Sequence, residues 1–185
     1  MSEAPLHPLE RDWYGEAVPG SPRWSLALEG TDLVLRGEVD AAPLRVPGDR
    51  EGRFLEGLWE GDVVEAFLLN PTTGYYLELN LAPGGAWWAC GHEAPRVRTE
   101  SGGSLLEGVR TSSLVGPEGW SAALRIPLAA LPRGLAFDPA ATRGNVTFCL
   151  GRPRRYLSVA DLGGGRPDFH RPERWIPLAE LLDQR

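Results

Sequence analysis

The chain has 185 residues, of which 42% are hydrophobic and 24% are charged, and these proportions are typical of a folded globular protein. The formal net charge is −6, so we expect no nucleic-acid partner, because neutralising phosphates requires a basic surface. All 19 basic residues are arginine, which indicates a bacterial, high-GC genome and makes any single arginine weak evidence of function.

The sequence indicates a protein of the cytoplasm. No segment approaches the ~20 consecutive apolar residues that a transmembrane helix needs, so we expect no membrane association. Residues 1–20 lack the basic start and the apolar core of a secretory signal. In a reducing compartment we expect Cys90 and Cys149 to be buried free thiols, since two cysteines alone cannot form a structural zinc site.

Short apolar runs alternate with glycine- and proline-containing turns along most of the chain, which is typical of an antiparallel β-sandwich. We expect an irregular arm over residues 1–20, followed by one all-β sandwich domain over residues 21–185. In chain order, the predicted elements are strands at 24–28, 33–39, 63–69, 75–81, 86–91, 108–114 and 120–126, a helical turn at 127–131, strands at 146–151 and 156–159, and a short terminal element at 175–182.

The three strands between residues 63 and 91 give the clearest local signal. Turn sequences at 70–74 and 83–85 join them, so we expect an antiparallel meander. Within the second strand every other residue is apolar, and the residues between are Tyr76, Glu78 and Asn80. One face of this strand is therefore expected to pack on the core, while the other carries a phenol, a carboxylate and a carboxamide.

The polar face of the meander is a candidate binding surface. Glu65 lies on the same side of the first strand, and one of the adjacent indoles of Trp87 and Trp88 must also point there. Carboxylates and amides bind sugar hydroxyls, and an aromatic ring covers the apolar face of a pyranose. The alternative is a solvated sheet face with cross-strand Glu–Arg pairs, and the pattern alone leaves both open.

Three stretches, in the same order, resemble family 9 carbohydrate-binding modules and their DOMON-like relatives. The first is LWEGDVVEAFLLNPTTGYYLELNLAPGGAWWACG at 58–91, which is similar to the central block of that family. The second is GWSAALRIPLAAL at 119–131, which resembles its Gly-Trp and Ile-Pro-Leu pattern. The third is RRYLSVADLGGGRPDFHRPERW at 154–175, which resembles its closing signature, so that the likeness spans roughly residues 54–182.

The resemblance implies a β-sandwich whose relatives bind sugar or haem and carry structural calcium. Sugar-binding members hold a terminal sugar between aromatic rings, for which this chain offers Trp59, Trp88 and Trp175. Unlike the secreted members, we expect this chain to be a free-standing cytosolic form. Matched residue by residue, the motif positions are Trp59, Asp62, Glu65, Tyr76, Glu78, Asn80, Trp88, Asp168 and His170.

The sequence offers few ligands for a cofactor. For haem, only His92 and His170 could act as an axial pair, because His7 lies in the predicted arm, so we expect no haem. Structural calcium stays open, although no spacing matches a known calcium loop. The oxygen donors available to calcium are Glu60, Asp62, Asp161 and Asp168.

Asp168 and His170 lie in a loop rich in glycine and proline, and two interpretations of them stay open. In one interpretation both side chains line the ligand site. In the other they pin the loop to the sheet, with Asp168 accepting backbone N–H groups and His170 hydrogen-bonded to a strand.

We therefore expect a non-catalytic module that binds a small molecule or oligosaccharide, above all a carbohydrate or glycoconjugate. The alternatives are a protein-interaction domain or homodimer that uses the same face, a haem-binding DOMON-type domain, and a small glycosidase that uses Glu65 and Glu78 as a carboxylate pair. No hydrolase motif or phosphate loop favours an enzyme. The predicted ligand-binding residues are Trp59, Glu65, Tyr76, Glu78, Asn80, Trp88, Asp168, His170 and Trp175.

Overall fold

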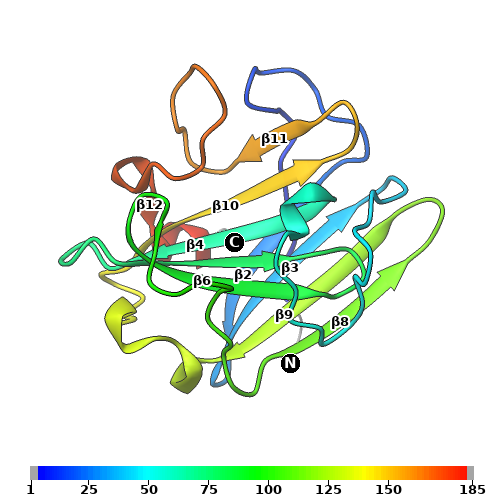
Figure 1. The fold of residues 1–185 in the computed structure, drawn as a ribbon. Coiled ribbons are helices and arrows are strands. Elements are labelled where there is room, and N and C mark those ends of the chain that lie inside the picture. The colour runs from blue at the N-terminus through cyan, green and yellow to red at the C-terminus, as the bar shows by residue number, and fades with distance from the viewer. Residues whose placement is uncertain (1–3, 183–185) are drawn as a thin grey trace.

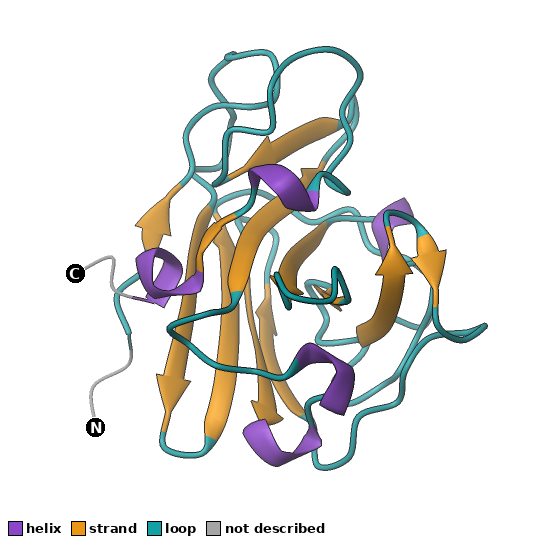
Figure 2. Ribbon diagram, turned by 90° about the vertical axis from the view of Figure 1, so that its left-hand side faces the viewer, coloured by secondary structure: helices purple, strands orange, loops and turns teal. Residues whose placement is uncertain are grey.

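The computed structural model describes residues 4–182, whose strands form two antiparallel sheets packed face to face (Figure 1). Within that range one sheet has five strands and the other has seven. The predicted all-β antiparallel sandwich is confirmed. In the same residues, helical structure is limited to short turns and one five-residue helix, so that strands and loops make up the body of the molecule (Figure 2).

The five-stranded sheet is built around two hairpins, and its strand order is β1-β2-β3-β9-β8. Every neighbouring pair in it is antiparallel. Except for the two-residue β1, each strand was predicted to within two residues of its observed ends. The strands are β1 (His7–Pro8), β2 (Arg23–Glu29), β3 (Asp32–Val39), β9 (Trp120–Pro127) and β8 (Arg110–Val115).

The seven-stranded sheet holds the predicted meander at its centre, and its order is β11-β10-β4-β5-β6-β7, with β12 also paired to β10. Strand β6 continues three residues beyond its predicted end at residue 91. The strands are β11 (Arg155–Ser158), β10 (Arg143–Leu150), β4 (Val63–Leu69), β5 (Tyr76–Leu81), β6 (Trp87–Ala94), β7 (Val97–Arg98) and β12 (Ile176–Pro177).

The helical elements are short and lie between strands. The predicted turn at 127–131 is a 3₁₀ turn, and the predicted terminal element at 175–182 consists of β12 followed by α1 (Leu178–Leu182). Helix α1 packs against β2 and β10 and so closes one end of the sandwich. The 3₁₀ turns are Leu58–Glu60, Leu128–Ala130, Arg133–Leu135 and Pro172–Arg174.

The register of the meander places the predicted polar residues on one side of the sheet. Glu65 of β4 pairs with Asn80 of β5, and Glu78 of β5 pairs with Cys90 of β6. Because directly paired residues share a face and the pleat alternates, Glu65, Glu78 and Asn80 all lie on the side that faces away from the other sheet. Trp88 pairs with Asn80 and points to this side, so that Trp87 points into the sandwich.

The inner side of the same strands forms the main hydrophobic core, between the two sheets. Leu77 and Leu79 of β5 are fully buried there, against Leu35 of β3 and Phe148 of β10. The sheets approach closely at Gly37, where an added Cβ would lie 2.8 Å from Cγ1 of Val64. Burial at about 25 cal/mol per Å² of apolar surface makes this core the main source of stability.

A second buried cluster covers the outer side of the seven-stranded sheet. The segment from residue 160 to 175 folds back over β4, β5 and β10, where its Trp175 packs with Phe67 and its Phe169 packs with Tyr156. This corrects the sequence interpretation of the polar face as an open surface. All six residues of β5 are buried, because apolar side chains from a distant segment cover the side that the alternation suggested was exposed.

The described part of the N-terminal segment runs along the sandwich. Strand β1 pairs with β2, the backbone N–H of Trp13 donates to the carbonyl of Tyr156 at 2.7 Å, and Asp12 forms an ion pair with Arg155. Residues 1–3 of the predicted arm and residues 183–185 of the predicted domain lie outside the described residues.

Two smaller expectations concern membranes and thiols. Over residues 4–182, no helix has the length and apolar character needed to cross a membrane. Cys90 and Cys149 are buried free cysteines, as predicted. Burial raises the pKa of both thiols, that of Cys90 to about 11, so both stay protonated at neutral pH.

Candidate ligand-binding site

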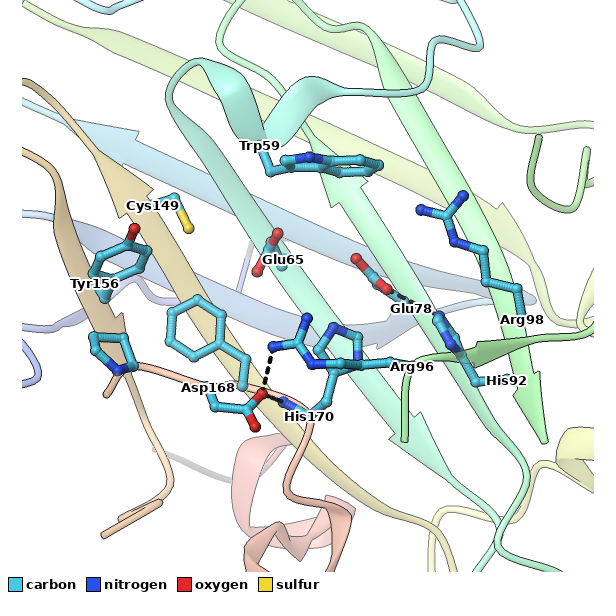
Figure 3. Close-up of a pocket in the computed structure, with 12 residues that line it drawn as sticks. Trp59, Glu65, Glu78, His92, Arg96, Arg98, Cys149, Tyr156, Asp168 and His170 are labelled. Carbon is cyan, nitrogen blue, oxygen red and sulfur yellow. Dashed lines mark hydrogen bonds and ion pairs between the residues drawn. The ribbon is translucent and has the colours of Figure 1, made fainter. Parts of the chain in front are cut away.

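A pocket of about 370 Å³ opens on the outer side of the seven-stranded sheet, at the edge of the second cluster (Figure 3). Its base is formed by Glu65 on β4, Glu78 on β5 and His92 on β6. The indole of Trp59, from the 3₁₀ turn that precedes β4, lies on one side of these carboxylates. The loop that carries Asp168 and His170 lies on the other side.

The nine residues predicted from the sequence divide into two groups. Five line the pocket, and they are Trp59, Glu65, Glu78, Asp168 and His170. The other four are fully buried behind its walls, and they are Tyr76, Asn80, Trp88 and Trp175. The physical reason for the division is the covering segment 160–175, which leaves only part of the polar face open.

Sequence reasoning did not place several residues that line the pocket. The sequence could have indicated His92, because it continues the alternation of Trp88 and Cys90 on β6. The loop residues Pro167 and Phe169 directly flank the predicted site residue Asp168 in the sequence. No local pattern predicts the remaining four, which are Arg96, Arg98, Cys149 and Tyr156.

Glu78 is held by three neighbouring groups at the base of the pocket. Nδ2 of Asn80 donates to its Oε1 at 3.1 Å, and Nε2 of His92 lies 3.0 Å from its Oε2. Burial acts to raise the pKa of Glu78, but the hydrogen bond with His92 and the nearby imidazole of His170 outweigh burial and hold the pKa below its ordinary value. Glu78 is therefore a buried carboxylate anion at neutral pH.

Glu65 lies on the neighbouring strand in a different electrostatic state. Its Oε2 accepts a hydrogen bond from the hydroxyl of Thr147 at 2.9 Å. Burial, together with the negative charge of Glu78, raises the pKa of Glu65 to about 8. The two carboxyl groups thus differ, and the pocket offers a protonated donor beside an ionised acceptor near pH 7.

The loop that carries Asp168 and His170 is fastened to the sheet by hydrogen bonds. Nδ1 of His170 and the hydroxyl of Tyr76 lie 2.7 Å apart, and the same hydroxyl accepts the backbone N–H of Arg96 at 3.0 Å. Oδ1 of Asp168 accepts from Nη2 of Arg96 at 2.7 Å and from the backbone N–H of His170 at 3.0 Å. These hydrogen bonds confirm that the two side chains pin the loop to the sheet, and the same side chains also line the pocket, so their role at a ligand site stays a prediction.

His170 is neutral at physiological pH. Burial lowers its pKa to about 4, with the positive charge of Arg96 acting in the same direction and Glu78 opposing it. A neutral imidazole has one nitrogen with a free lone pair and one N–H, so it can accept as well as donate.

Trp59 is the partly exposed indole of the pocket. Its indole meets that of Trp88 edge to face, with ring centroids 5.2 Å apart, and Trp88 in turn donates its Nε1–H to the carbonyl of Gly102 at 3.0 Å. The guanidinium of Arg98, which is paired with Glu56, lies 5.7 Å from the Trp59 ring and 4.9 Å from the Trp88 ring. Trp88 and Arg98 therefore fix the orientation of Trp59.

The histidine pair does not fit haem. His92 and His170 converge on the same carboxylate, Glu78, with ring centroids 5.4 Å apart. A porphyrin needs its two axial imidazoles on opposite faces of a wide plate, and these rings leave no space for one.

Three of the four acids considered for calcium, Asp62, Asp161 and Asp168, each bind separate backbone or arginine groups, and Glu60 is exposed. Asp62 accepts the backbone N–H groups of Leu44 at 3.0 Å and Gly151 at 2.6 Å, and Asp161 accepts that of Gly163 at 2.8 Å. Across residues 4–182, these acids do not form a shared cluster of metal-binding side chains.

The comparisons with known proteins identify the fold. No family model matches the chain, and no curated protein matches it in sequence. A proposed carbohydrate-binding protein from Bacteroides uniformis is similar in structure, with a TM-score of 0.70 and 20% sequence identity over 92% of this chain and 84% of that one.

Two solved structures of a family 9 carbohydrate-binding module from Caldicellulosiruptor kristjanssonii are also similar. The one in complex with glucose has a TM-score of 0.54 at 13% identity, covering 94% of this chain and 81% of that one. The one in complex with cellotriose has a TM-score of 0.53 at 12% identity, covering 95% and 78%. The fold is that of family 9 carbohydrate-binding modules. This confirms the fold expected from the three sequence stretches, while the DOMON likeness stays a prediction.

Proposed function

We propose that this domain binds a carbohydrate, without cleaving it, in the pocket between Trp59 and the loop that carries His170. The observation that carries the proposal is the placement of one partly exposed indole beside two carboxyl groups at the base of a pocket. An indole covers the apolar C–H face of a pyranose, while carboxyl and imidazole groups bind its hydroxyls.

The electrostatics of the pocket favour a neutral sugar. Arg96 and Arg98 line it, but each is already paired with a carboxylate, Asp168 and Glu56 respectively. Their charges are therefore largely balanced within the protein, and among the described residues the pocket lining offers no further arginine for an acidic sugar. Glu78 contributes an anion that accepts hydroxyl protons, and this would repel a sugar carboxylate.

The size and shape of the pocket favour a short sugar or the end of a chain. A volume of about 370 Å³ falls at the lower end of the range of roughly 300–1,000 Å³ for small-molecule sites. Strands close the base, and Trp59 and the loop at Asp168 stand on opposite sides (Figure 3). A long polysaccharide lying across the sheet would meet these walls, whereas a terminal unit would enter between them.

The solved structures with the same fold support this choice of ligand. The module from Caldicellulosiruptor kristjanssonii was solved with glucose and with cellotriose. These two sugars are therefore the first probes for the present chain, although at 12–13% identity the ligand itself does not carry over.

Isothermal titration calorimetry with a panel of glycans that includes glucose and cellotriose tests the proposal. We expect at least one glycan to bind, and we expect Trp59→Ala and Glu78→Gln each to weaken it by about tenfold or more, as lost stacking and a lost charged acceptor would do. Glu118→Gln is the matched control, because Glu118 is exposed in the turn between β8 and β9.

Two results would contradict sugar binding at this site. One is a complete lack of heat with neutral and charged glycans for a protein whose circular dichroism shows it folded. The other is a glycan that binds Trp59→Ala as tightly as the wild type. Release of shorter sugars during the titration would show instead that Glu65 and Glu78 act as a glycosidase pair.

A further inference from the structure

Two histidines and a glutamate converge at the base of the pocket. Glu78, His92 and His170 each offer a donor atom, and the three atoms lie within 4.8 Å of one another. In the described part of the chain no other group of three such side chains comes this close. The residues come from β5, from β6 and from the loop after residue 160, so the fold brings together groups that are far apart in sequence.

We propose that Glu78, His92 and His170 bind a divalent transition-metal ion of the zinc class. Zinc binds imidazole nitrogen and carboxylate oxygen at about 2.0–2.2 Å, so donors around one ion lie roughly 3–4 Å apart. The three donor atoms are therefore slightly further apart than in a filled site, and small side-chain rotations would close them around an ion. This inference does not rest on sugar binding.

Two buried atoms of this cluster have no partner among the described residues. His92 is 2% exposed, and while its Nε2 meets Glu78, its Nδ1 makes no hydrogen bond. Asn80 is fully buried, and its Oδ1 is also unpartnered, although its amide nitrogen donates to Glu78. Buried polar atoms without partners are costly, which is the situation expected where an ion and its bound water are part of the site.

The surrounding residues hold the three side chains as second-shell groups do around a metal. The hydroxyl of Tyr76 meets Nδ1 of His170, which leaves Nε2 of that ring for an ion. The Tyr76 ring also stacks on His92, with centroids 4.4 Å apart and planes within 5°. Asn80 binds Oε1 of Glu78 and leaves the other oxygen toward His92. Such contacts fix ring orientation and tautomer before an ion arrives.

The donor set selects the class of metal. Imidazole suits zinc, copper, iron and nickel, whereas calcium and magnesium prefer a shell made entirely of oxygen. Three protein donors at the base of an open pocket leave a coordination position for water or a ligand hydroxyl. The nearby cations oppose a metal ion only weakly, because Arg96 and Arg98 are paired with Asp168 and Glu56.

Metal titration of untagged, EDTA-treated protein tests this site. We expect about one equivalent of Zn²⁺ to bind by calorimetry, Co²⁺ to produce visible absorption bands of a low-symmetry site, and Ca²⁺ to give no heat. His170→Gln should lower the zinc affinity about a hundredfold or more, and Tyr76→Phe, which changes a supporting group, by about 10–100-fold.

His7→Gln is the matched control, because His7 lies on β1, in the other sheet, against Trp24. It should bind zinc like the wild type, and circular dichroism must show that each variant is folded. The inference is overturned if the wild type binds neither Zn²⁺ nor Co²⁺, if His170→Gln binds zinc unchanged, or if His7→Gln removes the binding. EDTA-treated protein that binds a sugar but no zinc would overturn the metal site alone and leave the proposed function standing.

Discussion

The two faces of the seven-stranded sheet use the same strands for opposite purposes. On the inner face, Leu77, Leu79 and their neighbours meet the other sheet in an apolar core. On the outer face, the residues between them are Tyr76, Glu78 and Asn80, which are also buried but are surrounded by aromatic rings, imidazoles and a second carboxyl. Both faces are buried, so burial alone does not distinguish the apolar face that stabilises the fold from the polar face that lines the candidate site.

The two faces differ in how completely their buried groups find packing or hydrogen-bond partners. Apolar side chains on the inner face need only close packing, which a partner sheet supplies. The outer face contains an ionised carboxylate, a carboxyl with a raised pKa and unpartnered nitrogen and oxygen atoms. These polar groups lie under a covering loop, where apolar side chains would pack without needing hydrogen bonds. A bound ligand can supply the partners that the polar groups lack.

Truncation on the inner face should have the largest effect on stability. Leu79→Ala removes a fully buried side chain from the core, so we expect the free energy of unfolding to fall by about 2–5 kcal/mol in urea denaturation. Leu114→Ala is the control, since Leu114 is 75% exposed on β8 and should change stability by less than ~0.5 kcal/mol. A loss below about 1 kcal/mol for Leu79→Ala would place the stabilising core elsewhere.

Removing the Glu65 carboxyl from the outer face should change how the free energy of unfolding depends on pH. The pKa of Glu65 is raised from 4.5 to about 8, so between these values the folded state keeps a proton that the unfolded state has lost. This contribution to stability is full below about pH 4.5 and is lost as the pH rises toward 8.

Urea denaturation of Glu65→Gln as a function of pH measures this contribution. Relative to the variant, the wild type should lose stability on the order of 2 kcal/mol as the pH rises through that window, since each unit of pKa shift is worth about 1.4 kcal/mol and water entering the pocket weakens the effect. If the difference in unfolding free energy between wild type and Glu65→Gln did not change with pH, Glu65 would be ionised across that whole pH window.

Removing a single hydroxyl on the outer face should lower the free energy of unfolding less than truncating Leu79 on the inner face. Tyr76→Phe removes the oxygen that meets His170 and accepts the backbone N–H of Arg96, so we expect a loss of about 1–2 kcal/mol. Amide hydrogen exchange should become faster at Arg96 and in the loop around His170. Tyr14→Phe, at a tyrosine that is 68% exposed, should leave both measurements unchanged. Unchanged exchange in Tyr76→Phe would show that other contacts hold the loop.

Removing the exposed ion pair at the rim of the pocket should have the smallest effect on stability. Arg96 and Asp168 have side chains that are 63% and 34% exposed, so Arg96→Gln should cost less than ~1 kcal/mol of stability. The backbone N–H of residue 96 still donates to Tyr76 in this variant, which keeps the loop in place. Arg110→Gln, which removes a similarly exposed arginine that is paired with Asp32 on the other sheet, is the comparison. A larger loss for Arg96→Gln alone would mean that the pair, and not the Tyr76 hydroxyl, holds the loop.

Local sequence patterns were sufficient for the longer strands and for part of the site. The two-residue period of β4 and β5 placed Glu65, Glu78 and Asn80 on one face, because turn sequences fixed the register between neighbouring strands. His92 was missed because the predicted strand ended at Gly91, although the alternation continues through β6 to Ala94.

The remaining features depend on contacts between distant segments. Strand β7 has only two residues and offers no pattern, so the sequence could not place Arg98 beside Trp59 or Arg96 beside Asp168. The covering of the outer face depends on Trp175 reaching Phe67, about a hundred residues earlier in the chain, and on Phe169 meeting Trp13 and Tyr156. No local period encodes such packing, which is why four predicted site residues lie buried behind the pocket instead of in it.

The most direct test of ligand binding on the outer face is NMR observation of the indole N–H groups of the seven tryptophans during glycan titration. The Trp59 signal, assigned with Trp59→Phe, should shift in a saturable manner with at least one glycan, while that of Trp120, which is buried at the far sheet, should stay in place. Shifts that leave Trp59 unmoved, or an unchanged spectrum with every glycan, would contradict the account.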